Sequence, residues 1–289
     1  EMCIRDRDKD YVIASDTDSI YLHMGDLVEA VYKGRETTTE GIVSFLNKVC
    51  EVELEPYIES SYQELAEYVN AYDQKMIMKR ENIADRGIWT AKKRYILNVW
   101  DSEGVRYEQA KLKIMGIEAI KTSTPAPCRT MLKDAFKLLM TGTEDEVIDY
   151  IEKCRSEFKN FPPEEVGFPR SVNNLQKYKG VSDIYNKGTP INVRGALLFN
   201  HYIKKNNLEH KYSAIQNGEK IRFCYLKTPN WMHENVISYI QDLPKELDLH
   251  KHVDYDLQFE KAFLEPIKVI LNCIGWETER KNTLESFFS

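Results

Sequence analysis

The chain has 289 residues, enough for about two domains, and its 42% hydrophobic and 30% charged residues are typical of a globular protein. It contains no apolar run of the roughly 20 residues that a membrane-spanning helix needs, so we expect no membrane association. The formal net charge of −6 argues against a surface that binds nucleic acid throughout, although it leaves room for a local basic track.

The cysteines indicate the cellular compartment of the protein, and the first ten residues indicate whether the chain is a fragment. The six cysteines form no C-x-x-C pair, which argues against a zinc site and favours reduced thiols in the cytoplasm. Residues 1–10 show neither periodicity nor an apolar face, and a core strand that begins at residue 11 would be a poor start for an independent domain. We therefore expect a fragment of a longer protein.

Two carboxylates, Asp16 and Asp18, lie between two apolar runs. Residues 11–14 predict a buried strand and residues 19–22 a second one, so the carboxylates would project from the tip of a tight hairpin. Oxygen ligands of this kind suit Mg²⁺, and a pair of such ions can activate an attacking oxygen and stabilise a leaving one. Because aspartate also favours turns for local hydrogen-bonding reasons, a purely structural turn stays open as an alternative.

The rest of the first hundred residues predicts helices packed on a small antiparallel sheet. A short helix is expected over 26–32, and a longer one begins near residue 39 and continues past Pro56 to about residue 69. Strands are expected over 75–83, 88–100 and 111–115, with a hairpin tip at Gly104. The fold class is therefore α+β, with this first domain spanning 11–116.

The second part of the chain predicts a mostly helical domain over 117–280. Residues 122–125 form a break, and a long irregular connection is expected over 160–192. Between and beyond these segments we expect helices over 126–141, 144–159, 193–206 and 256–273, and a strand over 220–227. Residues 281–289 form a tail.

A basic run follows in the predicted strand 88–100, at Lys92, Lys93, Arg94 and Tyr95. Since side chains alternate in a strand, Lys92 and Arg94 would share one face, and Lys93 and Tyr95 the other. Such cations could follow a phosphate backbone or reach into the minor groove of a duplex, whose edge is similar for all base pairs. A solvated strand with a core tyrosine remains the alternative.

Three further features each allow a functional and a structural interpretation. Glu81 could be a third carboxylate near a metal, or a surface residue paired with Arg80. Arg194, at the start of a helix, could hold a phosphate or be an ordinary surface arginine. The tail could dock on a partner or fold back on its own domain, and its apolar anchors are Leu284, Phe287 and Phe288.

Taken together, the motifs resemble family B DNA polymerases, and within that family the replicative enzymes of T-even-type tailed bacteriophages. The resemblance extends over nearly all of the chain after its first ten residues. The motifs that carry it are Asp-Thr-Asp-Ser-Ile-Tyr at 16–21, Lys-Lys-Arg-Tyr at 92–95, Leu-Lys-Ile-Met-Gly at 112–116 and Val-Arg-Gly at 193–195.

The resemblance implies that the hairpin belongs to a polymerase palm and serves template-directed nucleotidyl transfer with two Mg²⁺ ions. It makes Asp18 the firmer metal ligand and catalytic carboxylate, and Asp16 a weaker partner in the same site. Glu81 falls where the family has a carboxylate near the metals.

The resemblance also implies contacts with primer-template DNA and with a sliding clamp. Residues 92–95 would grip the primer-template, with Lys93 and Lys121 reaching the minor groove. Residues from about 117 onward would form the thumb, in which Arg194 and Lys261 hold backbone phosphates. The tail from residue 283 would be the clamp-binding peptide.

Several family features are missing or altered. The second metal aspartate, the fingers helix that binds the dNTP and the exonuclease domain are not found, so the second Mg²⁺ site is incomplete. The connection after Glu81 is short, Glu265 stands where phage enzymes can carry lysine, and the tail ends early. We expect the chain to be inactive alone and to need an N-terminal half on the same or another chain. The alternatives are a non-catalytic DNA-binding subunit and a nucleotide-sugar glycosyltransferase that uses Asp-x-Asp.

Overall fold

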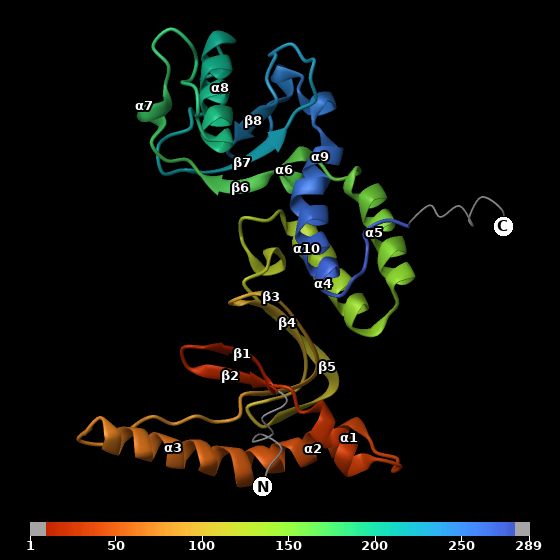
Figure 1. Cartoon of the computed structure of the whole chain (residues 1–289). Coiled ribbons are helices and arrows are strands. Elements are labelled where there is room, and N and C mark those ends of the chain that lie inside the picture. The colour runs from red at the N-terminus through yellow and green to blue at the C-terminus, as the bar shows by residue number, and fades with distance from the viewer. Residues whose placement is uncertain (1–9, 281–289) are drawn as a thin grey trace, which may run out of the picture. The chain divides into compact units, whose positions relative to one another are not determined.

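The computed structural model describes residues 10–280 (Figure 1). The chain divides into two compact units, the first ending at Met115 and the second beginning at Gly116. Both units combine helices with small antiparallel sheets, which confirms the α+β class. Within the described part of the chain, none of the helices has both the length and the hydrophobicity that crossing a bilayer requires.

The first unit opens with the predicted hairpin. Strands β1 (Val12–Asp16) and β2 (Ser19–Leu22) pair antiparallel and are joined by a two-residue turn. The expectation that these strands are buried is wrong, because Val12, Ile13 and Ile20 are each more than 40% exposed. The hairpin is a two-stranded sheet that packs through Tyr21 on one side, and no described element covers the apolar residues that face away.

Helices follow the hairpin as predicted: α1 (Gly25–Tyr32), α2 (Thr39–Val49) and α3 (Glu55–Tyr68), with the π-helical turn Cys50–Leu54 between the last two. The hydroxyl of Thr38 caps α2 by accepting a hydrogen bond from the Gly41 N–H at 3.1 Å. Pro56 lies in the first turn of α3, directly after the π-helical turn. The helix therefore continues past Pro56.

A three-stranded antiparallel sheet in the order β3–β4–β5 completes the unit. The strands are β3 (Asn82–Ala91), β4 (Arg94–Ser102) and β5 (Val105–Met115). The β4–β5 hairpin turns at Glu103 and Gly104, both with positive φ, as the predicted tip requires.

Two strand predictions in this unit are wrong. Residues 75–81 form no strand, because α3 holds them by side-chain bonds: Lys79 Nζ donates to Glu55 Oε2 at 2.6 Å and the Arg80 N–H to Glu55 Oε1 at 3.1 Å. The predicted single strand 88–100 is instead two strands, which reverse at Lys92 and Lys93 and pair Trp89 with Tyr95. Lys92 and Arg94 therefore do not alternate along one strand.

The second unit is built from helices around a small sheet that was only partly predicted. The helices are α4 (Ala126–Thr141), α5 (Glu144–Phe158), α6 (Pro163–Val166), α7 (Leu175–Tyr178), α8 (Ile191–Lys205), α9 (Tyr255–Phe259) and α10 (Glu265–Cys273). The sheet has the order β6–β7–β8, with β6 (Phe168–Ser171), β7 (Lys220–Tyr225) and β8 (Val236–Tyr239). The π-helical turn Glu260–Leu264 joins α9 to α10, so the predicted long C-terminal helix is confirmed.

Packing of α8 on β8 depends on a glycine. A Cβ atom at Gly195 would lie 2.4 Å from Ser238 Oγ and 2.8 Å from the Ser238 backbone nitrogen. Such distances are far below van der Waals contact, so only glycine lets the helix approach the strand this closely. The same contact places Arg194 at the edge of the sheet, beside the β7–β8 loop.

Candidate functional site

The acidic turn is formed as predicted, but its two carboxylates have different surroundings. Asp16 ends β1, and its Oδ1 accepts a hydrogen bond from the Thr17 N–H at 2.9 Å. Asp18 lies in the turn, is exposed, and has no hydrogen bond or ion pair within residues 10–280. Asp18 is therefore the carboxylate that is free to bind a cation.

Two lysines from the β3–β4 turn lie against Asp16. Lys92 Nζ is 3.6 Å from Asp16 Oδ1, and Lys93 Nζ is 3.4 Å from Asp16 Oδ2. The backbone of Lys93 is left-handed, with φ of 61°, in the turn that joins β3 to β4. The Thr17 N–H first, and then Lys93 and Lys92, lower the pKa of Asp16 despite some burial. The negative charge of Asp16 is thus already compensated by groups of the protein itself.

Aromatic packing holds the hairpin against the sheet. The Tyr21 ring lies 5.5 Å from Trp89 and 5.4 Å from Tyr95, in edge-to-face geometry. Burial, and then a hydrogen bond with Tyr95, raise the pKa of Tyr21 to about 12. Tyr95 itself is 7% exposed and belongs to the core cluster. Its position favours a structural role in aligning the acidic turn with the lysine turn.

The remaining residues of the predicted site in this unit are more dispersed. Glu81 forms an ion pair with Lys113, which lowers the pKa of Glu81, and not with Arg80. Among the described residues, no three Cys, His, Asp or Glu side chains lie close enough together to hold a metal ion. Asp16, Asp18 and Glu81 therefore do not form a complete cage. The oxygen ligands present here could supply only part of the coordination of one hard cation, and Asp18 would supply it.

A titration of Asp16 tests this description of the acidic turn. We expect carboxyl-carbon NMR to give Asp16 a pKa below its ordinary value of 3.8. In a Lys92→Ala/Lys93→Ala variant the pKa should rise, yet stay below the ordinary value, because the Thr17 N–H remains. A lowered pKa stabilises the fold above that value and loses its effect as the pH falls through it. An unshifted Asp16 in the unmodified chain would contradict the two ion pairs.

In the second unit, the predicted DNA-binding cations are each engaged within the protein. Lys121 Nζ lies 2.8 Å from Glu118 Oε1, and Lys261 is paired with Glu265 one helical turn away. Arg194 donates to the Asn235 side chain, and its guanidinium carbon lies 5.7 Å from the centre of the Tyr185 ring. The tail residues Leu284, Phe287 and Phe288 lie outside the described residues.

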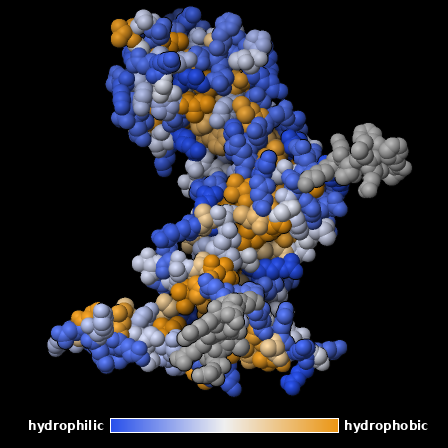
Figure 2. Space-filling view, viewed as in Figure 1, coloured by the Kyte–Doolittle hydropathy of each residue, from blue (hydrophilic) through white to orange (hydrophobic). Residues whose placement is uncertain are grey.

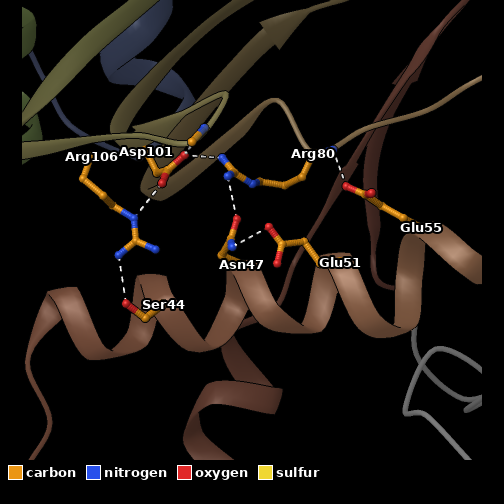
Figure 3. Close-up of polar contacts among 8 residues, drawn as sticks. Ser44, Asn47, Glu51, Glu55, Arg80, Asp101 and Arg106 are labelled. Atoms are coloured by element: carbon orange, nitrogen blue, oxygen red, sulfur yellow. Dashed lines mark hydrogen bonds and ion pairs between the residues drawn. The ribbon is translucent and has the colours of Figure 1, made fainter.

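One polar network, built around the buried Asp101, was not predicted from the sequence (Figure 3). Asp101 is 1% exposed and accepts hydrogen bonds from Arg80, from Arg106 Nε at 2.6 Å and from the Gly104 N–H at 3.0 Å. The two arginines continue to α2: Arg80 Nη2 donates to Asn47 at 2.6 Å and Arg106 Nη1 to Ser44 at 2.9 Å. The network fixes the chain immediately before Glu81 and ties α2 to the β4–β5 turn.

Comparisons with known proteins agree with the motifs. No protein-family model matches the chain. The chain is 33% identical over 291 residues to the DNA-directed DNA polymerase of Escherichia phage RB69, a match that covers 96% of this chain. It is 28% identical over 295 residues to the DNA-directed DNA polymerase of Enterobacteria phage T4, covering 97% of this chain. The chain spans about a third of the length of these relatives, 32% in each case. The resemblance to phage DNA polymerases is thereby confirmed.

Proposed function

We propose that this chain is the C-terminal palm-and-thumb part of a family B phage DNA polymerase. In the complete enzyme it would support template-directed transfer of a nucleotide from a dNTP to a primer 3′ end, in the host cytoplasm. The observation that carries the proposal is the free carboxylate of Asp18, two residues after the Asp16 that pairs with Lys92 and Lys93, in a chain similar to phage polymerases along almost its whole length. The first unit would be the palm and the second the thumb.

In this proposal the carboxylates of the first unit bind metal and its lysines contact DNA. Asp18 would hold Mg²⁺, with Asp16 and Glu81 nearby, and the metal would neutralise phosphate charge and activate the attacking oxygen. Lys92 and Lys93 would meet the primer-template, exchanging their contacts with Asp16 for DNA. Tyr95 and Tyr21 would keep the two turns in register through their ring contact of 5.4 Å.

The thumb cations would bind DNA by a similar exchange. Lys121, Arg194 and Lys261 each have an intramolecular partner that a phosphate or a base edge would have to replace. Glu265 is a negative partner where a relative can carry lysine, so the contact of Lys261 with DNA should be weak. A sliding clamp that binds the tail from residue 283 belongs to the same proposal.

A non-catalytic DNA-binding subunit is the second candidate, favoured by the lack of a three-residue metal cluster among the described residues. Such a subunit would bind DNA through the same residues as the polymerase, and it would differ from the polymerase only in not needing Asp18. A nucleotide-sugar glycosyltransferase is less well supported, since the strands of all three described sheets pair antiparallel, without the alternating βα pattern that this reading requires.

Duplex binding and primer extension by the chain alone test the proposal. The chain should bind primer-template DNA, with an affinity that falls about tenfold between about 50 and 200 mM salt if two phosphates are contacted. Primer extension by the chain alone should be undetectable, because the carboxylates of the described residues form an incomplete metal site. Extension by the chain alone, or binding that is insensitive to salt, would contradict the proposal.

A further inference from the structure

The carboxylate of Glu81 is held by a lysine from strand β5. Lys113 donates from its Nζ to Glu81 Oε1 and forms a close ion pair with it. The backbone at Glu81 is fixed separately, because its carbonyl oxygen accepts a hydrogen bond from the Glu103 N–H at 2.7 Å. The Glu81 side chain is 53% exposed, so it can change its partner without a movement of the backbone.

Lys113 lies on the face of the sheet that the hairpin covers. It is paired with Leu97 of β4, and directly opposite residues of an antiparallel pair share one face. Leu97 belongs to the buried cluster on which Tyr21 packs. Burial dominates the pKa of Tyr21, but the charges of Lys113 and Glu81 also contribute to it, with opposite signs. The ion pair therefore lies beside the hairpin, in which Tyr21 follows Asp18 by three residues.

The hairpin beside this ion pair offers a cation few ligands. Its outward-facing apolar side chains are exposed: Val12, Ile13 and Ile20. Figure 2 shows hydrophobic residues at the surface around the hairpin that Figure 1 labels β1 and β2. The charged residues of the two strands and their turn are Asp16 and Asp18, and Asp16 is already paired with two lysines. A cation bound at Asp18 would thus find its next carboxylate in Glu81.

We propose that Lys113 competes with a divalent cation for the carboxylate of Glu81. The inference rests on the proposed function, in which Asp18 holds the metal. An oxygen that accepts from an ammonium group cannot also bind a divalent ion closely, because the two cations repel each other. Glu81 joins Asp18 only when the divalent ion displaces Lys113. Lys113 is therefore a positioning residue that acts through Glu81 and raises the metal concentration at which the site fills.

Binding of Mn²⁺ to the chain tests this competition, since Mn²⁺ prefers the same oxygen ligands as Mg²⁺. Electron paramagnetic resonance measures the free ion at about 0.15 M salt, where distant charges are largely screened. Lys113→Met removes the ammonium group and should tighten Mn²⁺ binding by about two- to fivefold, the range that a partly exposed ion pair allows. Lys113→Arg keeps the ion pair and should bind Mn²⁺ as the unmodified chain does.

The matched control is Lys111→Met. Lys111 lies two residues earlier on the same face of β5, and its Nζ is 4.0 Å from the centre of the Tyr107 ring. Within residues 10–280 it has no carboxylate partner. Its replacement removes the same charge from the same face, so Mn²⁺ binding should stay close to that of the unmodified chain.

Two double variants locate the effect. With Glu81→Gln in the chain, Lys113→Met should no longer change Mn²⁺ binding, because the carboxylate for which the two cations compete is gone. With Asp18→Asn the gain should also disappear, because the ion needs both carboxylates. The Lys113 variants should keep the circular dichroism spectrum of the unmodified chain, and Lys113→Gln replaces Lys113→Met if that variant does not.

The outcomes separate this inference from the proposed function. A gain in Mn²⁺ affinity that requires both Glu81 and Asp18 supports the competition. An equal gain from Lys111→Met, a gain that survives Glu81→Gln or Asp18→Asn, or no gain at all would overturn it. These measurements use the chain alone, so failure of an assembled enzyme to extend a primer would contradict the proposed function and leave the competition standing.

Discussion

Asp101→Asn is expected to destabilise the first unit by about 3–5 kcal/mol, because it leaves the mostly buried guanidinium of Arg80 without the carboxylate that pairs with it. The side chain of Arg80 is 11% exposed and that of Asp101 is 1% exposed, so the arginine charge would stay buried without its counter-ion. The asparagine oxygen can still accept from the Gly104 N–H, which keeps the turn but not the charge balance. The loss should therefore come from Arg80, because the Arg106 side chain is 37% exposed and can be solvated.

Urea unfolding followed by tryptophan fluorescence measures this effect. Trp89 and Trp100 lie in the first unit and Trp231 and Trp276 in the second, so single-tryptophan variants assign each transition to its unit. Asp73→Asn is the matched control, since Asp73 is exposed and should change the free energy of unfolding by less than about 0.5 kcal/mol. Equal stability of the Asp101 and Asp73 variants would show that the network adds nothing.

The effect of Asp101 should also depend on pH. Burial raises the pKa of Asp101, but hydrogen bonds from Arg106, Arg80 and the Gly104 N–H outweigh it and leave the pKa below the ordinary value of 3.8. A carboxylate with a lowered pKa stabilises the fold above that value, and its contribution is lost as the pH falls through the lowered pKa. The difference between the unmodified chain and Asp101→Asn should therefore shrink in acid.

Local patterns were sufficient for most helices and for the two-carboxylate turn. The helix expected over 144–159 is α5, in which Thr143 and Glu146 form a capping box, with the Thr143 N–H 2.8 Å from the Glu146 carboxylate. The Asp16–Asp18 turn was predicted because short apolar runs flank it. In both cases the deciding residues are neighbours in the sequence.

The predictions that were wrong depend on contacts between distant residues. No glycine or asparagine marks the turn at Lys92 and Lys93, and apolar residues lie on both sides of it, from Ile88 to Trp100. The expected burial of β1 and β2 needs a second covering layer, which the described residues do not supply. Likewise, the pairing of Asp16 with two lysines and of Asp101 with two arginines joins residues that carry no common sequence motif.

Primer extension by the assembled enzyme should separate the two aspartates of the turn. With the chain joined to the non-matching part of the RB69 polymerase, Asp18→Asn should lower the extension rate by more than about a hundredfold, since even outer-shell ligands of a metal cost ten- to a hundredfold. Duplex affinity should be unchanged, because Asp18 has no contact with the lysines within the described chain.

Asp16→Asn should act on DNA binding instead. Lys92 and Lys93 lie 3.6 and 3.4 Å from the Asp16 carboxylate, so removing its charge frees two cations at the turn. Duplex binding should become tighter at low salt, and its salt dependence steeper by about one phosphate contact. Filter binding over a salt series measures both, with Asp18→Asn as the matched control. If Asp18→Asn extends primers at the unmodified rate, the chain is a DNA-binding subunit. If Asp16→Asn leaves the salt dependence of duplex binding unchanged, the pairs of Asp16 with the two lysines do not control DNA binding.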